Sequence, residues 1–178
     1  MKLVALMLAA ALVFGCAGPS PKLGAYGSSH EHADFKVYVN DKAVNFSQEK
    51  YMSPGVEGVD CGNDTTKLAH LHNMDGGLVH KHARGVTWAY FFSTLNMNLT
   101  DSCLVLDNGT GYCNGNGKRW EYSVNGDAVS SIKDLEIHDK DRVLITYGAS
   151  YEEAVRQYAS VTSKASAEGS GNECGPPG

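Results

Sequence analysis

Six of the seven histidines in this chain occur in three pairs of the form His-x-His. Random placement gives only about 0.3 such pairs in a chain of this length, so composition does not account for them. Residues two apart point to the same face of a β-strand, whereas on a helix they point in different directions. We therefore expect strands that carry both members of each pair on one face: His30 and His32, His70 and His72, and His80 and His82.

Alternation of apolar and polar residues predicts strands over most of the chain. Hairpins are expected at 35–46, 68–83 and 103–113, and further strands near 119–124 and 142–147. The similar segments 39–44 and 124–129 predict two similar hairpin turns. Apolar residues spaced i, i+3, i+4 and i+7 predict a core helix within 85–97, with Thr87 as its N-cap. The expected fold is α+β and β-rich, with a C-terminal helix and a Gly/Pro-rich tail over 151–178.

The second hairpin determines how four of the histidines meet. A three-residue turn at 75–77 would pair His72 with His80 and His70 with His82. All four imidazoles then lie on one face of the hairpin, since strand side chains alternate.

The first strand adds a third set of side chains to that face. His30, His32 and Asp34 have the parity opposite to Phe35 and Val37, which are expected in the core. Three strands are therefore expected to present histidines on the side away from the core helix.

Two later segments carry a resemblance to a known family. Residues 120–126 read W-E-Y-S-V-N-G and residues 138–147 read H-D-K-D-R-V-L-I-T-Y. These resemble the two signature strands of β-grasp domains related to the transcobalamin C-terminal domain, over about 68–147, with Lys140 where that family usually has Gly. The resemblance implies a β-grasp-like domain, for which we expect bounds of 30–150. Within it, few apolar residues, Pro54 and three glycines predict an irregular insertion at 47–67.

Residues 30–147 are also similar to a group of exported archaeal proteins. The shared segments are H-x-H-A-D-F, H-L-H and H-x-H-A. This resemblance implies an archaeal surface protein and supplies no activity.

The N-terminus predicts export. Lys2 precedes an apolar run from Leu3 to Phe14, which is shorter than the about 20 residues that span a bilayer. The run fits a signal peptide over 1–15, and the junction before Cys16 resembles a lipobox. We expect a lipidated Cys16, a flexible tether over 16–29 and a position on the outer face of the cell membrane. Cleavage without lipidation is the alternative.

The remaining four cysteines fit an exported, oxidising setting. Cys103 and Cys113 flank a hairpin with an Asn-Gly turn signal, so they are expected to form a disulfide across it. By elimination Cys61 pairs with Cys174, with free thiols as the alternative. Four Asn-x-Ser/Thr sequons are candidate glycan acceptors: Asn45, Asn63, Asn98 and Asn108.

Imidazoles gathered on one face predict a transition-metal site. Nitrogen ligands without thiolate suit Cu(II), Zn(II), Ni(II) or Fe(II), and the Irving–Williams order favours copper, with zinc next. Asp34 and Asp75 are candidate ligands, or acceptors for ring N–H groups. His138 is unpaired and is expected to take no part.

The function predicted from these features is metal capture or presentation by a membrane-anchored lipoprotein, without catalysis and with no catalytic residue assigned. The net charge of −5 disfavours a nucleic-acid partner. One alternative is a zinc-dependent hydratase or hydrolase with a three-histidine site like that of α-type carbonic anhydrases. The other is an adhesion or assembly module in which metal bridges a homo-oligomer or a surface partner.

Overall fold

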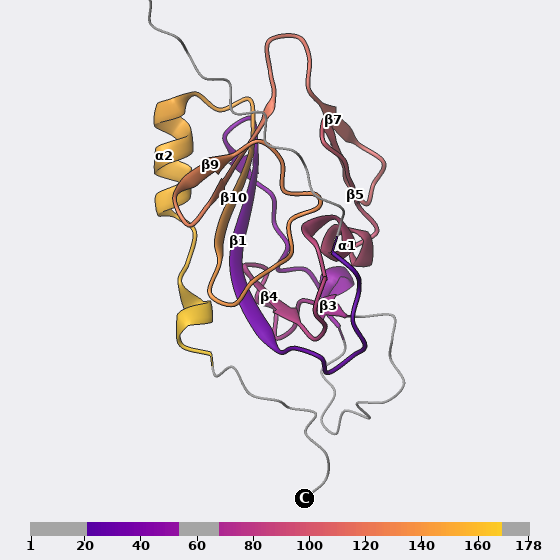
Figure 1. The fold of residues 1–178 in the computed structure, drawn as a ribbon. Helices are drawn as coiled ribbons and strands as arrows, with labels where there is room; N and C mark the ends of the chain where they lie inside the picture. Colours follow the sequence, from indigo (N-terminus) through magenta and orange to yellow (C-terminus); the bar gives the residue numbers. More distant parts are fainter. Residues whose placement is uncertain (1–20, 54–67, 169–178) are drawn as a thin grey trace, which may run out of the picture.

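The protein folds around one large mixed sheet with a small second sheet beside it (Figure 1). The computed structural model describes residues 21–53 and 68–168. In this part the large sheet has seven strands in the order β3-β4-β1-β10-β8-β9, with β2 paired to β1, and the small sheet has the order β5-β6-β7. Only β1 and β10 pair in parallel within the described sheets. The predicted α+β, β-rich class is confirmed.

The strands and helices have the following bounds. The large sheet contains β1 (Glu31–Val39), β2 (Lys42–Ala43), β3 (Ala69–His70), β4 (Leu78–Lys81), β8 (Trp120–Val124), β9 (Asp127–Val129) and β10 (Arg142–Tyr147). The small sheet contains β5 (Asn98–Leu99), β6 (Cys103–Val105) and β7 (Gly111–Cys113). The helices are α1 (Trp88–Thr94) and α2 (Tyr151–Ala159), with 3-10 turns η1 (Glu49–Tyr51) and η2 (Lys164–Ser166).

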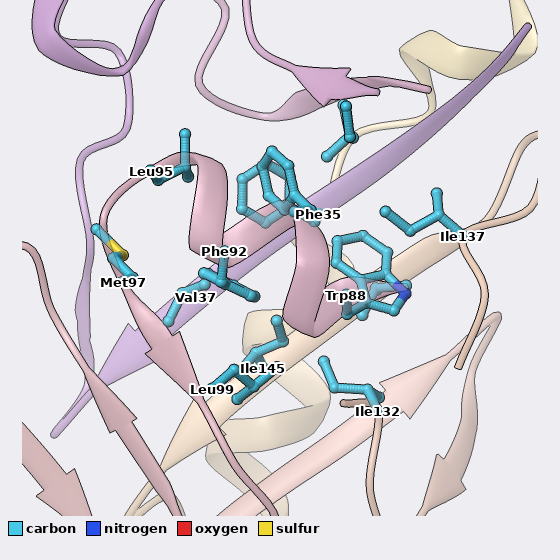
Figure 2. Close-up of a cluster of buried hydrophobic side chains, with 14 of the residues drawn as sticks. Phe35, Val37, Trp88, Phe92, Leu95, Met97, Leu99, Ile132, Ile137 and Ile145 are labelled. Atoms are coloured by element: carbon cyan, nitrogen blue, oxygen red, sulfur yellow. The ribbon is translucent and has the colours of Figure 1, made fainter. Parts of the chain in front are cut away.

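The core lies between the central strands and α1 (Figure 2). Alternate residues of β1 and β10, such as Phe35 and Ile145, are buried against Trp88 and Phe92 of the helix. The predicted N-cap is confirmed, because the Thr87 hydroxyl accepts a hydrogen bond from the backbone N–H of Tyr90. The helix is shorter than the predicted range because Gly85 and Asn96 adopt left-handed backbone conformations on either side of it.

The opposite face of the sheet carries α2 and η2. The Thr146 hydroxyl of β10 donates to the side chain of Gln157 in α2 at 2.7 Å. Tyr38 of β1 hydrogen-bonds Ser160 just after α2 at 2.8 Å. Helix α2, the predicted C-terminal helix, ends at Ala159. Because side chains alternate along β1, the residues at positions 32 and 34 share this second face.

The two similar hairpin turns predicted from the sequence are present. Asn40 and Asp41 connect β1 to β2, Asn125 and Gly126 connect β8 to β9, and all four have positive φ. Such residues match the twist of two-residue hairpins. Lys140 also has a positive φ of 66°, which gives a physical reason for glycine at this position in the resembling family. The β-grasp assignment itself remains a prediction.

Several predicted features lie outside the described residues: the signal peptide, Cys16, Cys61, Asn63 and Cys174. Within the described ranges, no helix is long and apolar enough to cross a membrane. The sequons at Asn45, Asn98 and Asn108 are exposed. Part of the predicted insertion packs on the core, because Tyr51 of η1 is buried.

The predicted disulfide between Cys103 and Cys113 is confirmed. The two residues face each other directly in the β6–β7 pair, with their Cα atoms 4.1 Å apart. The bond closes the hairpin that forms most of the small sheet.

We expect the double variant Cys103→Ser/Cys113→Ser to unfold at lower urea concentration, with a loss of about 2–3 kcal/mol, because a short closed loop limits the entropy of the unfolded chain. Reductant should lower the stability of the parent in the same way and leave the double variant unchanged. A disulfide map that links either residue to Cys61 or Cys174 would contradict this pairing.

Candidate metal centre

Three adjacent strands place a histidine at the same level of the large sheet. His32 of β1 is paired with His80 of β4, and His80 is paired on its other side with His70 of β3. Neighbouring strands lie about 4.8 Å apart. The backbone alone therefore brings one imidazole from each of three strands into a single row.

The predicted register of the second hairpin is wrong by two residues. His70 is opposite His80, not His82, and Ala69 is opposite Lys81. The connection is longer than a three-residue turn because Asn73 and Met74 have left-handed backbone conformations. A shift of two residues preserves parity, so all four histidines of the hairpin still lie on the predicted face.

All six predicted histidines come together in one cluster. Going round the cluster, each ring contacts the next, and the contacts return to the starting residue. The centroid distances are 4.7 Å for His30–His32, 4.4 Å for His32–His80, 3.8 Å for His80–His72, 5.7 Å for His72–His70, 4.9 Å for His70–His82 and 5.0 Å for His82–His30. His70 also stacks on His80 at 5.8 Å.

Three members of this cluster could hold a metal ion. One ring nitrogen each from His30, His32 and His80 lies within 4.8 Å of the other two. Metal–imidazole bonds of 2.0–2.1 Å place two nitrogens on one tetrahedral ion about 3.3 Å apart. Closing the three nitrogens to about this spacing would give a three-histidine site.

The cluster is set into the protein rather than spread on its surface. His32, His80 and His82 are buried, whereas His30, His70 and His72 are half-buried. Desolvation by burial, followed by the charges of the neighbouring histidines with His72 first among them, lowers the pKa of His80 to about 2. His80 is therefore neutral at ordinary pH, which is the form that binds a metal.

The two predicted carboxylates have other partners. Asp34 is fully buried and accepts hydrogen bonds from the Thr162 hydroxyl and from the backbone N–H groups of Lys164 and Ala165. Asp75 accepts from the backbone N–H of Gly77 and forms an ion pair with Lys164. Among the described residues, neither belongs to the group that could hold an ion. Asp34 therefore attaches η2 to β1, and Asp75 attaches it to the connection between β3 and β4.

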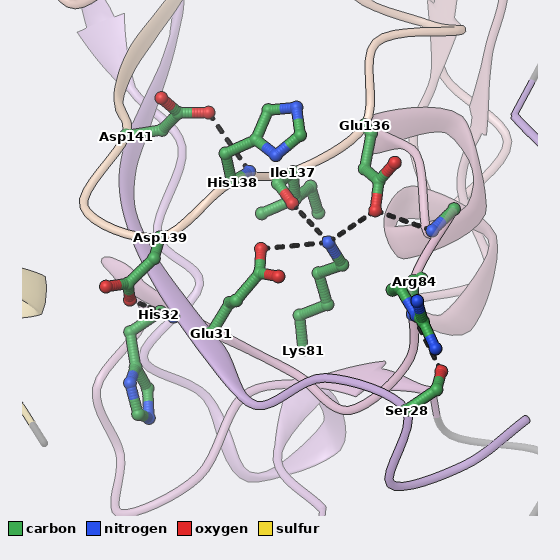
Figure 3. Close-up of polar contacts among 11 residues, drawn as sticks. Ser28, Glu31, His32, Lys81, Arg84, Glu136, Ile137, His138, Asp139 and Asp141 are labelled. Carbon is green, nitrogen blue, oxygen red and sulfur yellow. Dashed lines mark hydrogen bonds and ion pairs between the residues drawn. The ribbon is translucent and has the colours of Figure 1, made fainter. Parts of the chain in front are cut away.

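His138 is not in the candidate ligand group among the described residues. It is exposed, and its backbone N–H donates to Asp141 at 3.1 Å (Figure 3).

A buried lysine behind the cluster was not anticipated. Lys81 is fully buried, and its ammonium group donates to Glu31 at 2.9 Å, Glu136 at 2.7 Å and the carbonyl of Ile137 at 2.6 Å (Figure 3). It lies between His80 and His82 in β4, so its side chain leaves the opposite face of the strand. The sequence contained one indication of this site, because Lys81 falls on the core-facing side of the alternating pattern. A lysine buried there needs acidic partners.

Backbone and aromatic contacts that the sequence did not reveal hold two of the histidines. Tyr26 stacks on the His82 ring at 5.1 Å, and Gly27 N–H donates to the His82 carbonyl at 2.7 Å. On the other side, the His32 N–H donates to the Asp139 carboxylate at 3.1 Å (Figure 3). The Lys140 N–H donates to the His32 carbonyl at 2.7 Å. The segment before β1, through Tyr26 and Gly27, and the turn before β10, through Asp139 and Lys140, therefore hold the cluster from two sides.

Comparison of the chain with protein-family models, curated proteins and solved structures gives no match. The resemblances to transcobalamin-related β-grasp domains and to exported archaeal proteins thus remain predictions from sequence. The function is argued below from the chemistry of the cluster.

We expect the metal-free protein to lose stability as the pH falls below about 6.5, the pKa of histidine in an unfolded chain. Above that pH, His80 is neutral in both states. Below it, the unfolded chain gains a proton that folded His80 does not accept until the pH approaches 2. This group alone gives a slope of up to about 1.4 kcal/mol per pH unit.

Urea unfolding with a chelator present, from pH 7.5 to 4.5, measures this slope. His80→Gln should have a shallower slope than the parent, whereas His138→Gln should not. Equal slopes for His80→Gln and the parent would contradict the assignment.

Proposed function

We propose that this protein is an exported, membrane-anchored lipoprotein that binds copper or zinc through its six-histidine cluster. It captures or presents the ion at the cell surface, and no catalysis is assigned to it. The observation that carries the proposal is the group of His30, His32 and His80, whose ligand nitrogens lie within 4.8 Å of one another.

The fold supports binding because it fixes the ligands before an ion arrives. His32 and His80 occupy paired positions on adjacent strands, and both are buried. Their backbones are held by sheet hydrogen bonds, so binding costs little conformational entropy. Six imidazoles this close together also repel one another whenever they protonate, a cost that metal binding explains.

The donor set supports copper or zinc. Every member of the described cluster offers imidazole nitrogen, which suits Cu(II), Zn(II), Ni(II) and Fe(II). Copper stands highest in the Irving–Williams order, and zinc accepts three histidines with an open fourth position.

An exported location is supported by the Cys103–Cys113 disulfide, which indicates an extracytoplasmic protein. The basic start, the apolar run from Leu3 to Phe14 and the Cys16 junction support export followed by lipid attachment. Tyr26 contacts the cluster, so few residues separate it from the proposed anchor at Cys16.

A zinc hydratase or hydrolase is the second candidate, favoured by the three-histidine donor set, since catalytic zinc sites use three protein ligands and keep a fourth position for water. Carbon dioxide hydration and ester hydrolysis by the zinc-loaded protein distinguish the two candidates. If the zinc-loaded parent catalyses either reaction and His80→Ala abolishes that turnover, the protein is a zinc enzyme and the proposal of metal presentation is wrong. A metal-dependent increase in mass on size-exclusion chromatography would instead favour assembly through shared metal.

Protein purified without a histidine tag should bind copper or zinc, measured by elemental analysis and by competition with a chromophoric chelator. His80→Ala should weaken binding by more than about 100-fold, because loss of a direct ligand costs at least as much as loss of a group that orients one. His138→Ala, the matched control, should bind as the parent does. Unchanged affinity in a folded His80→Ala variant would exclude the proposed site.

Cys16→Ser should release the protein from the membrane or leave the precursor uncleaved, because the acyl chain is lost. Fractionation of cells, with the N-terminus determined by mass spectrometry, measures this. Membrane retention of a cleaved Cys16→Ser protein would exclude the lipid anchor and leave the metal site unaffected.

A further inference from the structure

The cluster contains more ligands than one ion uses. Zinc and copper sites commonly take three or four protein ligands, whereas six imidazoles form the closed set of contacts here. We infer that the cluster binds two ions, the first through His30, His32 and His80 and the second through His70, His72 and His82. This inference rests on the proposed function.

The strand order divides the ligands in this way. The strands β1 and β3 flank β4, and each supplies one His-x-His pair, His30 and His32 at the start of β1 and His70 and His72 at the end of β3. The segment of β4 contributes one histidine to each side. His80 contacts His32 at 4.4 Å, and His82 contacts His70 at 4.9 Å.

The ring spacings suit coordination in both sets. Two imidazoles on one tetrahedral ion have ring centres about 5 Å apart, given bonds of 2.0–2.1 Å and about 1 Å from nitrogen to ring centre. In the first set, His30 and His32 are 4.7 Å apart. In the second set, His70 is 4.9 Å from His82 and 5.7 Å from His72.

The two sites differ in how far they are formed. Among the described residues, only the first set has its three ligand atoms within 4.8 Å of one another. The second set must rotate His70 and His72, which are half-buried and closer to solvent. The first cation also repels a second one, because the two sets lie close together: the rings of His72 and His80 have centroids 3.8 Å apart. The ions therefore bind in order, the second more weakly.

Two single variants separate the sites. His30 belongs to the first set and His72 to the second, both are half-buried, and glutamine keeps each position polar. His138→Gln is the control, because that residue is exposed and outside the cluster.

The experiment is a titration of the tag-free full-length protein with Zn(II), followed by native mass spectrometry and by competition with a chelator. The parent and His138→Gln should bind two ions, the second at least about 10-fold more weakly than the first. His30→Gln should lose the tight event, and His72→Gln should lose only the weak one. Circular dichroism confirms that each variant is folded.

A measurement on the parent alone keeps the inference testable if a variant unfolds. With two equivalents of Cu(II), the electron paramagnetic resonance spectrum should show coupling between neighbouring ions, and with one equivalent it should not. Binding of a single ion overturns the two-ion inference and leaves the proposed function standing, whereas binding of none overturns the proposed function. If the parent binds two ions but His30→Gln and His72→Gln both lose the same binding event, this division of the ligands is wrong.

Discussion

The pairing of β4 with both β1 and β3 is the constraint on which the site depends. This one strand aligns His80 with His32 on one side and with His70 on the other. A slip of one residue in either pair would turn that strand's histidines to the other face of the sheet. The cluster therefore depends on strand register, and the hydrogen bonds of the sheet fix the relative positions of its imidazoles.

Buried charges hold the same strands from both faces. On the core side, Lys81 connects β4 with Glu31 of β1 and with Glu136. On the histidine side, the buried carboxylate of Asp34 binds the chain around η2. Removing one member of such a set leaves an uncompensated buried charge, which is far costlier than losing an exposed ion pair. The Lys81 contacts fix β1 and β4 relative to each other, and the Asp34 contacts fix β1 relative to η2.

Much of the fold could be predicted because its signals are local. The period-two pattern indicated the strands, Thr87 indicated the helix start, and the Asn-Gly turn indicated the Cys103–Cys113 bond. The turn that connects β3 to β4 could not be predicted as well. Left-handed conformations at Asn73 and Met74 lengthen that connection, and no simple pattern marks them. The roles of Asp34 and Tyr26 were missed because their partners are far away in the sequence or in a segment without periodicity.

The sequence by itself determined which face each histidine occupies, because the spacing of two in His-x-His matches the alternation of a strand whatever its register. That is why a two-residue error in pairing did not scatter the cluster. Only the tertiary structure decided which imidazoles become neighbours, how deeply each is buried, and that His30, His32 and His80 form the tightest group. Those properties depend on the order of strands in the sheet and on long-range contacts such as Asp139 with the backbone of His32. No local pattern records them, because they arise when separate segments pack together, as β1 does against β4 and as His32 does against Asp139, which is 107 residues away.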